Sequence, residues 1–376
     1  MRFSFSEEQE ELRRVVRRFL ETTSPLTEAR RLMDTREGCE PAVWKQLAQE
    51  LALPGVAIPE AYGGQGFGQV ELGVVLEEMG RALLCAPYFG SLALAANAIV
   101  CAGSEAQKQA LLPALASGEA LGALAAAEPS GRWDADGVAT EARERGGAWR
   151  LTGAKSFVVD GASADLLVVA ARAPQSRGSD GLSLFTLRGD ADGVTRRPLE
   201  TIDPTRKLAR VELNDAAAEP LGEPGGGAAA LARALDLGAT ALANESVGLA
   251  SRLLELTVEY AKARMQFGRP IGSFQAIKHK CADMLLELEL ARSAAYCAAE
   301  SADEGSAEFP AIASLAKAQA CDAALHVAAE SIQIHGGLGF TWEQDVHLFF
   351  KRAKANEVLL GDPTLHRERY AQRLGV

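Results

Sequence analysis

The chain has 376 residues, enough for two or three domains of ordinary size, and 48% of them are hydrophobic while 24% are charged. This balance is typical of globular proteins and gives no sign of disorder. The formal net charge of -11 argues against a nucleic-acid partner, because binding to phosphates relies on a basic surface and on the release of counterions.

Six cysteines are scattered without a CxxC motif, and most lie in Ala- and Leu-rich stretches, so we expect buried apolar thiols in a reducing compartment. The five histidines show no HxxH or HExxH spacing, so we expect no metal site. The first residues lack the apolar segment of a secretory signal, and the longest apolar stretches, such as 92–102, are too short for a membrane span. These features predict a cytoplasmic protein.

Residues 1–118 predict an N-terminal α-helical domain. Ser6 has the character of an N-cap before a helix with acidic residues in its first turn, and Pro41 begins a second amphipathic helix. A glycine-rich loop covers residues 59–68. Further helices are predicted at 70–84, at 90–102 and from Ser104 to near Gly118.

Residues 119–222 predict a middle β domain. Short β-rich runs alternate there with turn sequences at intervals of roughly ten residues, which favours an antiparallel barrel or sandwich. The runs are 138–140, 149–153, 156–160, 166–172, 182–187 and 209–213.

Residues 223–376 return to a helical pattern of long Ala- and Leu-rich segments joined by short loops, as in an antiparallel four-helix bundle. The predicted helices span 228–263, 275–301, 311–335 and 342–359. The predicted fold is therefore mainly α with a central β domain: N-terminal helices, a β-barrel or sandwich, and a C-terminal bundle.

The turn at 264–275, RMQFGRPIGSFQ, is the strongest local feature of the chain. Arg264 can pair with a phosphate, and Phe267 can cover an adenine or the edge of a flavin. Gln275 opens a new helix, whose positive end favours anions. Taken alone, an ordinary helix hairpin that ends in an arginine explains the segment equally well.

A second loop, QIHGGLGF at 333–340, ends a later bundle helix. We expect it at the same bundle end as residues 264–275, where its glycines would let backbone amides approach a diphosphate. Glycine pairs of this kind are also common at ordinary helix ends.

Together the two loops resemble the hallmark sequences of the acyl-CoA dehydrogenases, and Glu128-Pro129, 151–155 and 203–213 are similar to the β domain of that family. The similarity covers nearly the whole chain in the same order. It implies FAD as the cofactor and the alpha,beta-oxidation of an acyl-CoA, as in fatty-acid or lipid β-oxidation. It also implies an electron-transfer flavoprotein or similar acceptor as partner.

The resemblance implies that the two loops hold the diphosphate and adenosine of an FAD that belongs to a neighbouring subunit. The residues that match this half-site are Arg264, Phe267, Gln275, Gln333, Gly336 and Gly337. Phe157 matches the flavin-ring side of the site. One cofactor shared by two chains implies a homo- or hetero-oligomer, at least a dimer and usually a tetramer.

The base of the family is a carboxylate within reach of the alpha proton of the substrate. In most members it follows the last long helix, where this chain has Leu360, and in a second subset it lies early in the first bundle helix, where this chain has Gly238. Glu245, two turns after Gly238 in an apolar groove, is the best replacement, the alternative being an ion pair with an adjacent helix. Asp362 is interpreted as a helix-end or turn residue.

Two threonines that hydrogen-bond the flavin ring in the family are Ala127 and Val159 here, and each lost bond costs about 1 kcal/mol. A retained half-site for a neighbour and a weakened site of its own resemble the smaller chain of heterotetrameric acyl-CoA dehydrogenases. Those enzymes act on bulky CoA thioesters, including steroid side chains, and a second type of chain supplies the base.

Several functions stay open at this point. The chain is a catalytic acyl-CoA dehydrogenase, the non-catalytic partner chain of one, a flavin monooxygenase or oxidase on the same fold, or a scaffold that has lost its cofactor. A flavin absorption band excludes the last of these, and reactivity of the reduced flavin with oxygen marks the third.

Overall fold

The computed structural model describes residues 5–376, which divide into two compact units. The helical unit contains residues 5–30, 69–84 and 239–376, and the β unit contains residues 31–68 and 85–238. Helices α2 (Leu26–Met33) and α7 (Gly227–Ala263) each contribute residues to both units.

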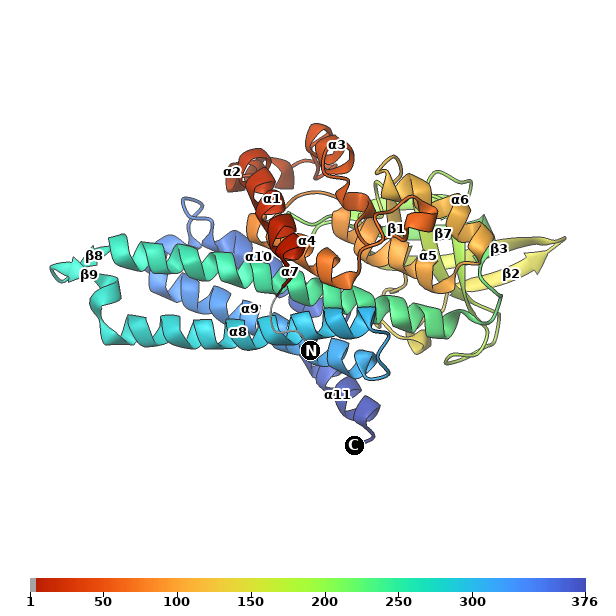
Figure 1. The fold of residues 1–376 in the computed structure, drawn as a ribbon. Helices are drawn as coiled ribbons and strands as arrows, with labels where there is room; N and C mark the ends of the chain where they lie inside the picture. Colours follow the sequence, from red (N-terminus) through yellow and green to blue (C-terminus); the bar gives the residue numbers. More distant parts are fainter. Residues whose placement is uncertain (1–4) are drawn as a thin grey trace. The chain divides into compact units, whose positions relative to one another are not determined.

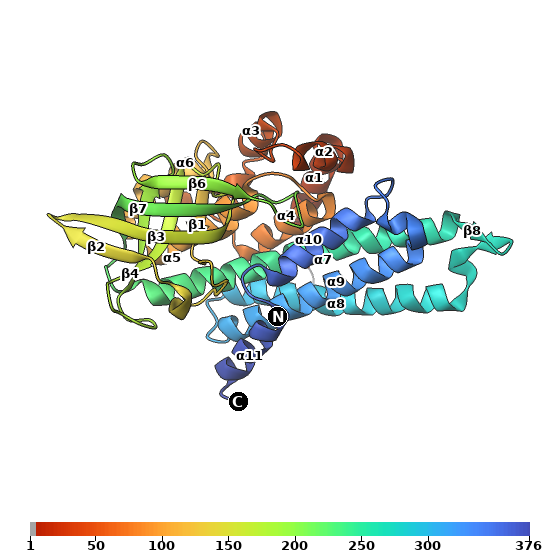
Figure 2. The ribbon, with the colours of Figure 1, turned by 180° about the vertical axis from the view of Figure 1, so that it is seen from behind.

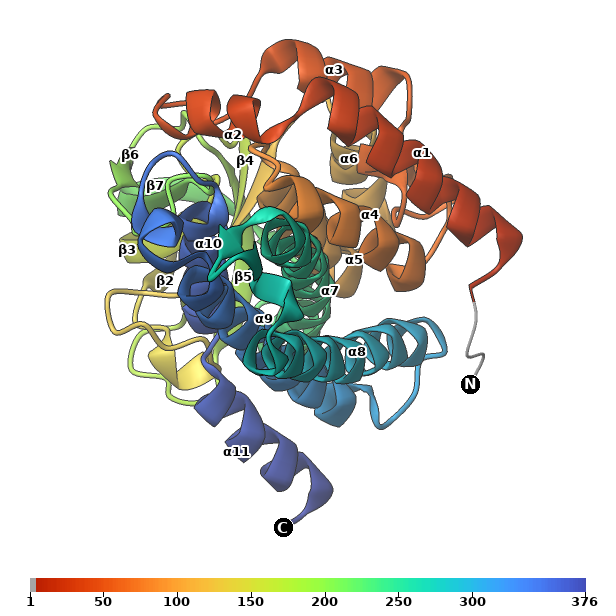
Figure 3. The ribbon, with the colours of Figure 1, turned by 90° about the vertical axis from the view of Figure 1, so that its left-hand side faces the viewer.

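The helical unit is built around a bundle of long helices, which Figure 3 shows nearly end-on. Besides parts of α2 and α7, its helices are α1 (Glu7–Thr23), α4 (Gln69–Ala82), α8 (Gln275–Asp303), α9 (Phe309–His335), α10 (Val346–Val358) and α11 (Pro363–Leu374). A short hairpin of β8 (Met265–Gln266) and β9 (Arg269–Pro270) joins α7 to α8, with the turn η5 (Ile271–Ser273) after it, and η6 (Gly336–Phe340) follows α9 (Figure 1).

Local sequence signals start two of these helices. The Ser6 hydroxyl accepts a hydrogen bond from the Gln9 backbone N–H at 3.2 Å, and the Gln9 side chain accepts one from the Ser6 N–H at 2.9 Å. This capping box confirms the predicted N-cap. Asp362 caps α11 by accepting a hydrogen bond from the Leu365 N–H at 2.8 Å, so its interpretation as a helix-end residue is also confirmed.

Helices α4 and α7 cross at two glycines. A Cβ atom placed on Gly248 would lie 1.8 Å from the backbone oxygen of Glu77, and one placed on Gly80 would lie 2.1 Å from the backbone oxygen of Glu245. The crossing therefore tolerates no side chain at either position. It brings α4 with its two buried carboxylates, Glu77 and Glu78, against the bundle.

Arginines on α1 and α8 pair with the two buried glutamates of α4. Arg17 donates to both carboxylate oxygens of Glu78, at 2.7 and 2.8 Å. Glu77 lies 2.9 Å from Arg13 and accepts hydrogen bonds from Tyr296, at 2.6 Å, and from Arg292. Both glutamates are 1% exposed, so these partners compensate charges that would otherwise be costly to bury.

The β unit surrounds a single seven-stranded sheet. Its strands are β1 (Gly122–Ala125), β2 (Glu141–Arg145), β3 (Ala148–Val159), β4 (Leu166–Arg172), β5 (Leu182–Arg188), β6 (Val194–Leu199) and β7 (Leu208–Leu221). Strands β2–β3, β3–β7, β7–β5 and β5–β4 pair antiparallel, and a parallel contact between Glu141 and Arg172 closes the ring. Figure 2 shows β2 and β3 extending beyond the other strands.

The β unit also holds short helical segments, six before β1 and one between β1 and β2. These are α3 (Pro41–Gln49), η1 (Leu53–Gly55), η2 (Glu60–Tyr62), the π-helix η3 (Phe89–Ala96), α5 (Asn97–Ala102), α6 (Glu105–Ala116) and η4 (Ala135–Gly137). The core of the sheet is filled by alanine, valine and leucine side chains, with Phe185 as its largest buried member.

The predicted fold class, mainly α with a central β domain and a C-terminal helical bundle, is confirmed. Several details differ. Helices α2 and α11 and strands β1, β2, β6, β8 and β9 were not predicted, 138–140 is not a strand, and 149–160 is essentially one long strand. The helix predicted at 90–102 begins as a π-helix, and the one predicted at 342–359 begins only at Val346.

All six cysteines are free, but only Cys85 and Cys321 are buried, whereas the other four are half-buried. Within residues 5–376, no helix is both long and apolar enough to cross a membrane.

We expect Gly248→Ala to lower the free energy of unfolding by about 2 kcal/mol, because the added methyl group overpacks the α4–α7 crossing. In an open helix the same change stabilises by up to about 1 kcal/mol, so the sign of the effect is diagnostic. Denaturant unfolding measures it. Gly73→Ala is the matched control and should cost less, because its added Cβ would lie 3.0 Å from the side chain of Asn244 and not against backbone. An unchanged or increased stability of Gly248→Ala would contradict the close crossing.

Candidate functional site

The β8–β9 hairpin exposes the residues predicted to contact a cofactor. Its turn residues, Phe267 (φ 51°) and Gly268 (φ 74°), both have the positive φ that a tight two-residue hairpin requires. The Phe267 side chain is 90% exposed, an unusual state for a phenylalanine. Arg264, at the end of α7, and Gln275, at the start of α8, are also exposed. The hairpin therefore displays an aromatic ring, a guanidinium and an amide together.

Aromatic contacts brace this hairpin. The ring of Phe274 meets the ring of Phe267 edge-on, with centroids 6.1 Å apart. The guanidinium of Arg269 lies 4.1 Å above the Phe274 ring, a cation–π contact. Phe274 also precedes the first turn of α8 without capping it through its side chain. Its carbonyl accepts a hydrogen bond from the Ile277 N–H at 3.2 Å, so an anion would meet the N–H groups that precede Ile277.

The second loop is open at its two glycines. Gln333, Gly336 and Gly337 are exposed, and Gly336 has φ 60° and ψ -143°, a backbone region that is essentially restricted to glycine. A Cβ atom on Gly336 or Gly337 would meet no atom within 4 Å. The backbone there is thus accessible to a ligand.

The two loops share one end of the bundle. The rings of Tyr260, near the end of α7, and His335, at the end of α9, are stacked with centroids 4.1 Å apart. The Tyr260 hydroxyl donates a hydrogen bond to the His335 carbonyl at 3.4 Å. Burial lowers the pKa of His335, so the stacked imidazole is neutral at pH 7. Figure 1 shows the β8–β9 hairpin and the α9–α10 connection at this end of the bundle.

Phe157 occupies an irregular point of strand β3 in the β unit. The pairing of β3 with β7 shifts register between Lys155 and Val158, and Phe157 has φ 58° and is 37% exposed. A non-glycine residue in this backbone region is uncommon and directs its side chain away from the regular pleat. Ala127 and Val159 are both 1% exposed and offer no side-chain hydrogen bond.

A buried ion pair behind this strand orders the neighbouring loop. Lys155, 0% exposed, donates to Glu128 at 2.7 Å and to the Ala126 carbonyl at 3.1 Å. Glu128 also accepts hydrogen bonds from the N–H groups of Ala139 and Thr140 and from the Thr140 hydroxyl. The pair thus connects residues 126–128 to the start of β2.

Burial opposes ionisation of both members of this pair, but the net shift of the pKa differs between them. It lowers the pKa of Lys155 to about 8, because desolvation of the ammonium outweighs the attraction of Glu128. It opposes ionisation of Glu128 too, but the ammonium and the hydrogen bonds prevail and hold the pKa of Glu128 below its usual value. Both groups are therefore charged near pH 7.

Glu245, the predicted replacement base, is committed to an ion pair. It is 2% exposed, and Arg352 on α10 donates a hydrogen bond to its carboxylate at 2.7 Å. The contact agrees with the other interpretation of Glu245 given by the sequence, an ion pair with a residue on an adjacent helix. Leu360 is 1% exposed and has φ 63°, and Gly238 lies within α7.

The segment around Leu360 is held by groups that sequence reasoning did not single out. Lys317, 0% exposed on α9, donates hydrogen bonds to the carbonyls of Asn356, Glu357 and Gly361 at 3.0, 3.2 and 3.0 Å. His366 Nε2 donates to the Leu360 carbonyl at 3.1 Å. The sequence did contain a sign of this role, because Lys317 lies among alanines in the α9 sequence. A charge in such an apolar segment is costly unless it has partners.

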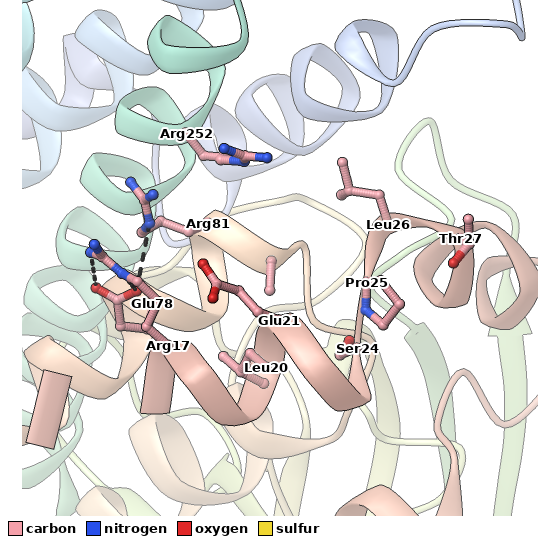
Figure 4. Close-up of a pocket in the computed structure, with 11 residues that line it drawn as sticks. Arg17, Leu20, Glu21, Ser24, Pro25, Leu26, Thr27, Glu78, Arg81 and Arg252 are labelled. Carbon is pink, nitrogen blue, oxygen red and sulfur yellow. Dashed lines mark hydrogen bonds and ion pairs between the residues drawn. The ribbon is translucent and has the colours of Figure 1, made fainter. Parts of the chain in front are cut away.

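A surface pocket of about 270 Å³ lies elsewhere in the helical unit, between α1, α2, α4 and α7 (Figure 4). Arg17, Arg81 and Arg252 line it. Arg17 is paired with Glu78, and Arg81 donates to both oxygens of Glu255 at 2.8 and 2.9 Å. None of the predicted site residues lines this pocket. Across residues 5–376, no group of three or more His, Cys, Asp or Glu side chains has the arrangement of a metal site.

Three family models match the chain in succession. They describe the N-terminal domain (residues 6–119), the middle domain (123–216) and the C-terminal domain (225–375) of acyl-CoA dehydrogenases. The chain therefore belongs to the acyl-CoA dehydrogenase family, whose members are flavoprotein oxidoreductases.

Relatives and solved structures agree with this family over almost the full length. The acyl-CoA dehydrogenase IpdE2 of Mycobacterium tuberculosis is 35% identical over 95% of this chain and 94% of its own. The butyryl-CoA dehydrogenase of Megasphaera elsdenii superimposes with a TM-score of 0.93 at 30% identity, covering all of both chains. A chain of the ChsE4–ChsE5 complex of Mycobacterium tuberculosis gives 0.90 at 28% identity, covering 100% of this chain and 99% of that one.

We expect the stability of the protein to fall between pH 7.5 and pH 5 partly because of His366. Burial lowers the pKa of this histidine to about 3, and its Nδ1 has no partner within residues 5–376. The unfolded chain binds the proton near pH 6.5 and the folded chain does not, so the stabilisation present above pH 6.5 is lost as the pH falls toward 3.

His366→Gln, which can still donate to the Leu360 carbonyl, removes this titration. The wild type should therefore lose about 2 kcal/mol more free energy of unfolding than the variant between pH 7.5 and pH 5. Denaturant unfolding at the two pH values measures the difference, and His279→Gln, at an exposed position, is the control. Equal losses in wild type and His366→Gln would show that His366 is accessible to protons in the folded state.

Proposed function

We propose that this chain is a subunit of an FAD-dependent acyl-CoA dehydrogenase that supplies half of a cofactor site and depends on a second, homologous chain for the catalytic base. The observation that carries the proposal is the contrast between the two parts of the site. The bundle end with Arg264, Phe267 and Gly336 is open, whereas Leu360 and Gly238 stand at the two positions that, by the resemblance, would hold the base.

The residues at the bundle end fit a dinucleotide diphosphate. Arg264 and the uncapped first turn of α8 offer positive charge and N–H donors, and Gly336 and Gly337 leave the backbone open to close approach. Phe267 and Gln275 add a ring for stacking and an amide for hydrogen bonding, and Gln333 adds a second amide. These six residues form the proposed half-site for an FAD carried by the neighbouring subunit.

The β unit fits a flavin ring less well. Phe157 projects from the irregular point of β3, but Ala127 and Val159 cannot donate the hydrogen bonds that hydroxyl groups would supply. Two missing bonds of about 1 kcal/mol each would weaken binding roughly 30-fold. We therefore infer that this chain holds an FAD of its own weakly or not at all.

The reaction of the family needs a hydride acceptor and a catalytic base. The bound flavin accepts the hydride that leaves the beta carbon of the acyl thioester. The alpha proton needs a carboxylate within hydrogen-bond reach, and Glu245 is unsuited to this task because it is buried and paired with Arg352. The base must then come from another chain, and the ChsE4–ChsE5 relative is, by its own description, a complex of two differently named proteins.

Further expectations follow from this proposal. The substrate is a bulky acyl-CoA of lipid β-oxidation, the assembly is a heterotetramer, and the electron acceptor is an electron-transfer flavoprotein or a similar protein. We place the assembly in the cytoplasm. The resemblance to hetero-oligomeric members of the family supports the first three inferences. The six free cysteines support the fourth, because a reducing compartment keeps thiols free.

Co-expression with candidate homologous chains, followed by subunit analysis and flavin quantification, tests the proposal. We expect a mixed assembly with two flavins for every four chains, and little flavin on this chain when it is purified alone. Full flavin occupancy of the isolated chain, with rapid bleaching by an acyl-CoA, would overturn it. Rapid oxidation of the reduced flavin by oxygen would instead identify an oxidase or monooxygenase.

Arg264→Ala should release flavin from the mixed assembly, because a charge-assisted hydrogen bond to phosphate contributes about 2 kcal/mol, or roughly a 30-fold change in Kd. Arg269→Ala is the matched control: it lies on the same hairpin and removes the same charge, but its guanidinium stacks on Phe274. Flavin retention after ultrafiltration measures both. Equal retention in the two variants would contradict a specific role for Arg264.

A further inference from the structure

Leu360 adopts a backbone conformation that leucine rarely adopts. Its φ is 63°, in the left-handed region, and its side chain is 1% exposed. Left-handed backbone brings Cβ close to the following carbonyl oxygen, so residues other than glycine, asparagine and aspartate enter this region only when their surroundings impose it. The surroundings of Leu360 must therefore supply that constraint.

Lys317 supplies donors on both sides of Leu360. Its ammonium bonds to the carbonyls of Asn356 and Glu357 in the last turn of α10 and to the carbonyl of Gly361, which directly follows Leu360. All three protons of the ammonium are thus used on this segment. The position also suits a cation, because the carbonyl end of a helix carries partial negative charge.

Other contacts hold the same segment less directly. His366 donates to the Leu360 carbonyl, and Asn356 donates to the Ser246 hydroxyl on α7 at 3.1 Å. Lys317 is the group among these that carries a full charge and spans the left-handed turn. Because it is fully buried, its bonds do not compete with water.

We propose that Lys317 is a positioning residue that imposes the left-handed conformation at position 360. The segment thereby keeps the backbone geometry of a base position even though its side chain is a leucine. That position 360 corresponds to a base position rests on the proposed function. The role of Lys317 in setting the backbone conformation there does not.

A comparison of glycine and alanine at position 360 reports on the backbone alone. Both substitutions remove the buried leucine side chain, and they differ by a single methyl group. Alanine is strained in the left-handed region and glycine is not, whereas elsewhere alanine is the more stabilising residue because it restricts the unfolded chain. The sign of the difference therefore shows which conformation position 360 adopts.

The experiment measures unfolding equilibrium constants of Leu360→Gly and Leu360→Ala in the wild-type chain and in a Lys317→Met background. In the wild-type chain we expect the unfolding constant of the alanine variant to be about fivefold larger than that of the glycine variant. In the Lys317→Met background the ratio should fall to about one or reverse, because the segment is then free to relax.

Leu83 provides the matched control, since it is a leucine of the same unit with φ 48° and 0% exposure. The glycine preference at Leu83 should be the same with Lys317 and with Lys317→Met, because a general loss of stability does not alter it. If Lys317→Met does not fold, Lys317→Gln keeps two of the donors and should reduce the ratio at position 360 partially.

Two results would overturn the proposal. One is alanine as stable as glycine at position 360 in the wild-type chain, which would show that the left-handed conformation is not imposed. The other is a ratio at position 360 that is unchanged by substitution of Lys317. Neither result depends on flavin or on a partner chain, so the proposed function and this inference can fail independently.

Discussion

Tyr260 and His335 stack where α7 and α9 end, and the chemistry that we propose for this chain depends on that contact. A helix end leaves backbone groups without partners inside the helix, and two such ends held together present them toward one place. Because the contact is between rings at the ends of long, packed helices, the bundle holds the ends of both loops, while contacts within the hairpin, such as that of Arg269 with Phe274, brace its turn. A site that spans two subunits requires this kind of rigidity, since neither chain can adjust the half-site of the other.

Buried cations organise both regions in which the family carries out its chemistry. Lys155 holds the loop before β2 in the β unit through Glu128, and Lys317 holds the end of α10 in the helical unit through three carbonyls. Neither lysine needs to contact a ligand in order to hold its segment in place. The framework of the family therefore persists around Ala127, Val159 and Leu360, three positions where we infer that polar side chains of the family have been replaced. The fold can therefore persist when reactive side chains are lost, because buried contacts such as these hold the fold and a few other side chains carry out the chemistry.

Much of the fold was predictable from periodicity. The bundle helices α7, α8 and α9 begin and end within a few residues of their predicted bounds, because apolar residues at helical spacing continue over many turns. Most of the missed elements are short, although α11 covers twelve residues. Helix α2 covers eight residues and β1 covers four, too few for a period to stand out, and Trp342 was assigned to a helix because its loop has no glycine or proline between Phe340 and Val346.

The sequence by itself determined the family, the order of the domains and the two loops that match a dinucleotide site, because these follow from local patterns and motifs. It also placed Leu360 and Gly238, neither of them a carboxylate, at the two positions that the resemblance predicts for the base. Only the tertiary structure decided what the remaining charged groups do: Glu245 meets Arg352, 107 positions away, and Lys317 meets the carbonyls that flank Leu360. Contacts of this kind depend on which helix faces come together, and the packing of whole helices sets them after the local pattern has been satisfied.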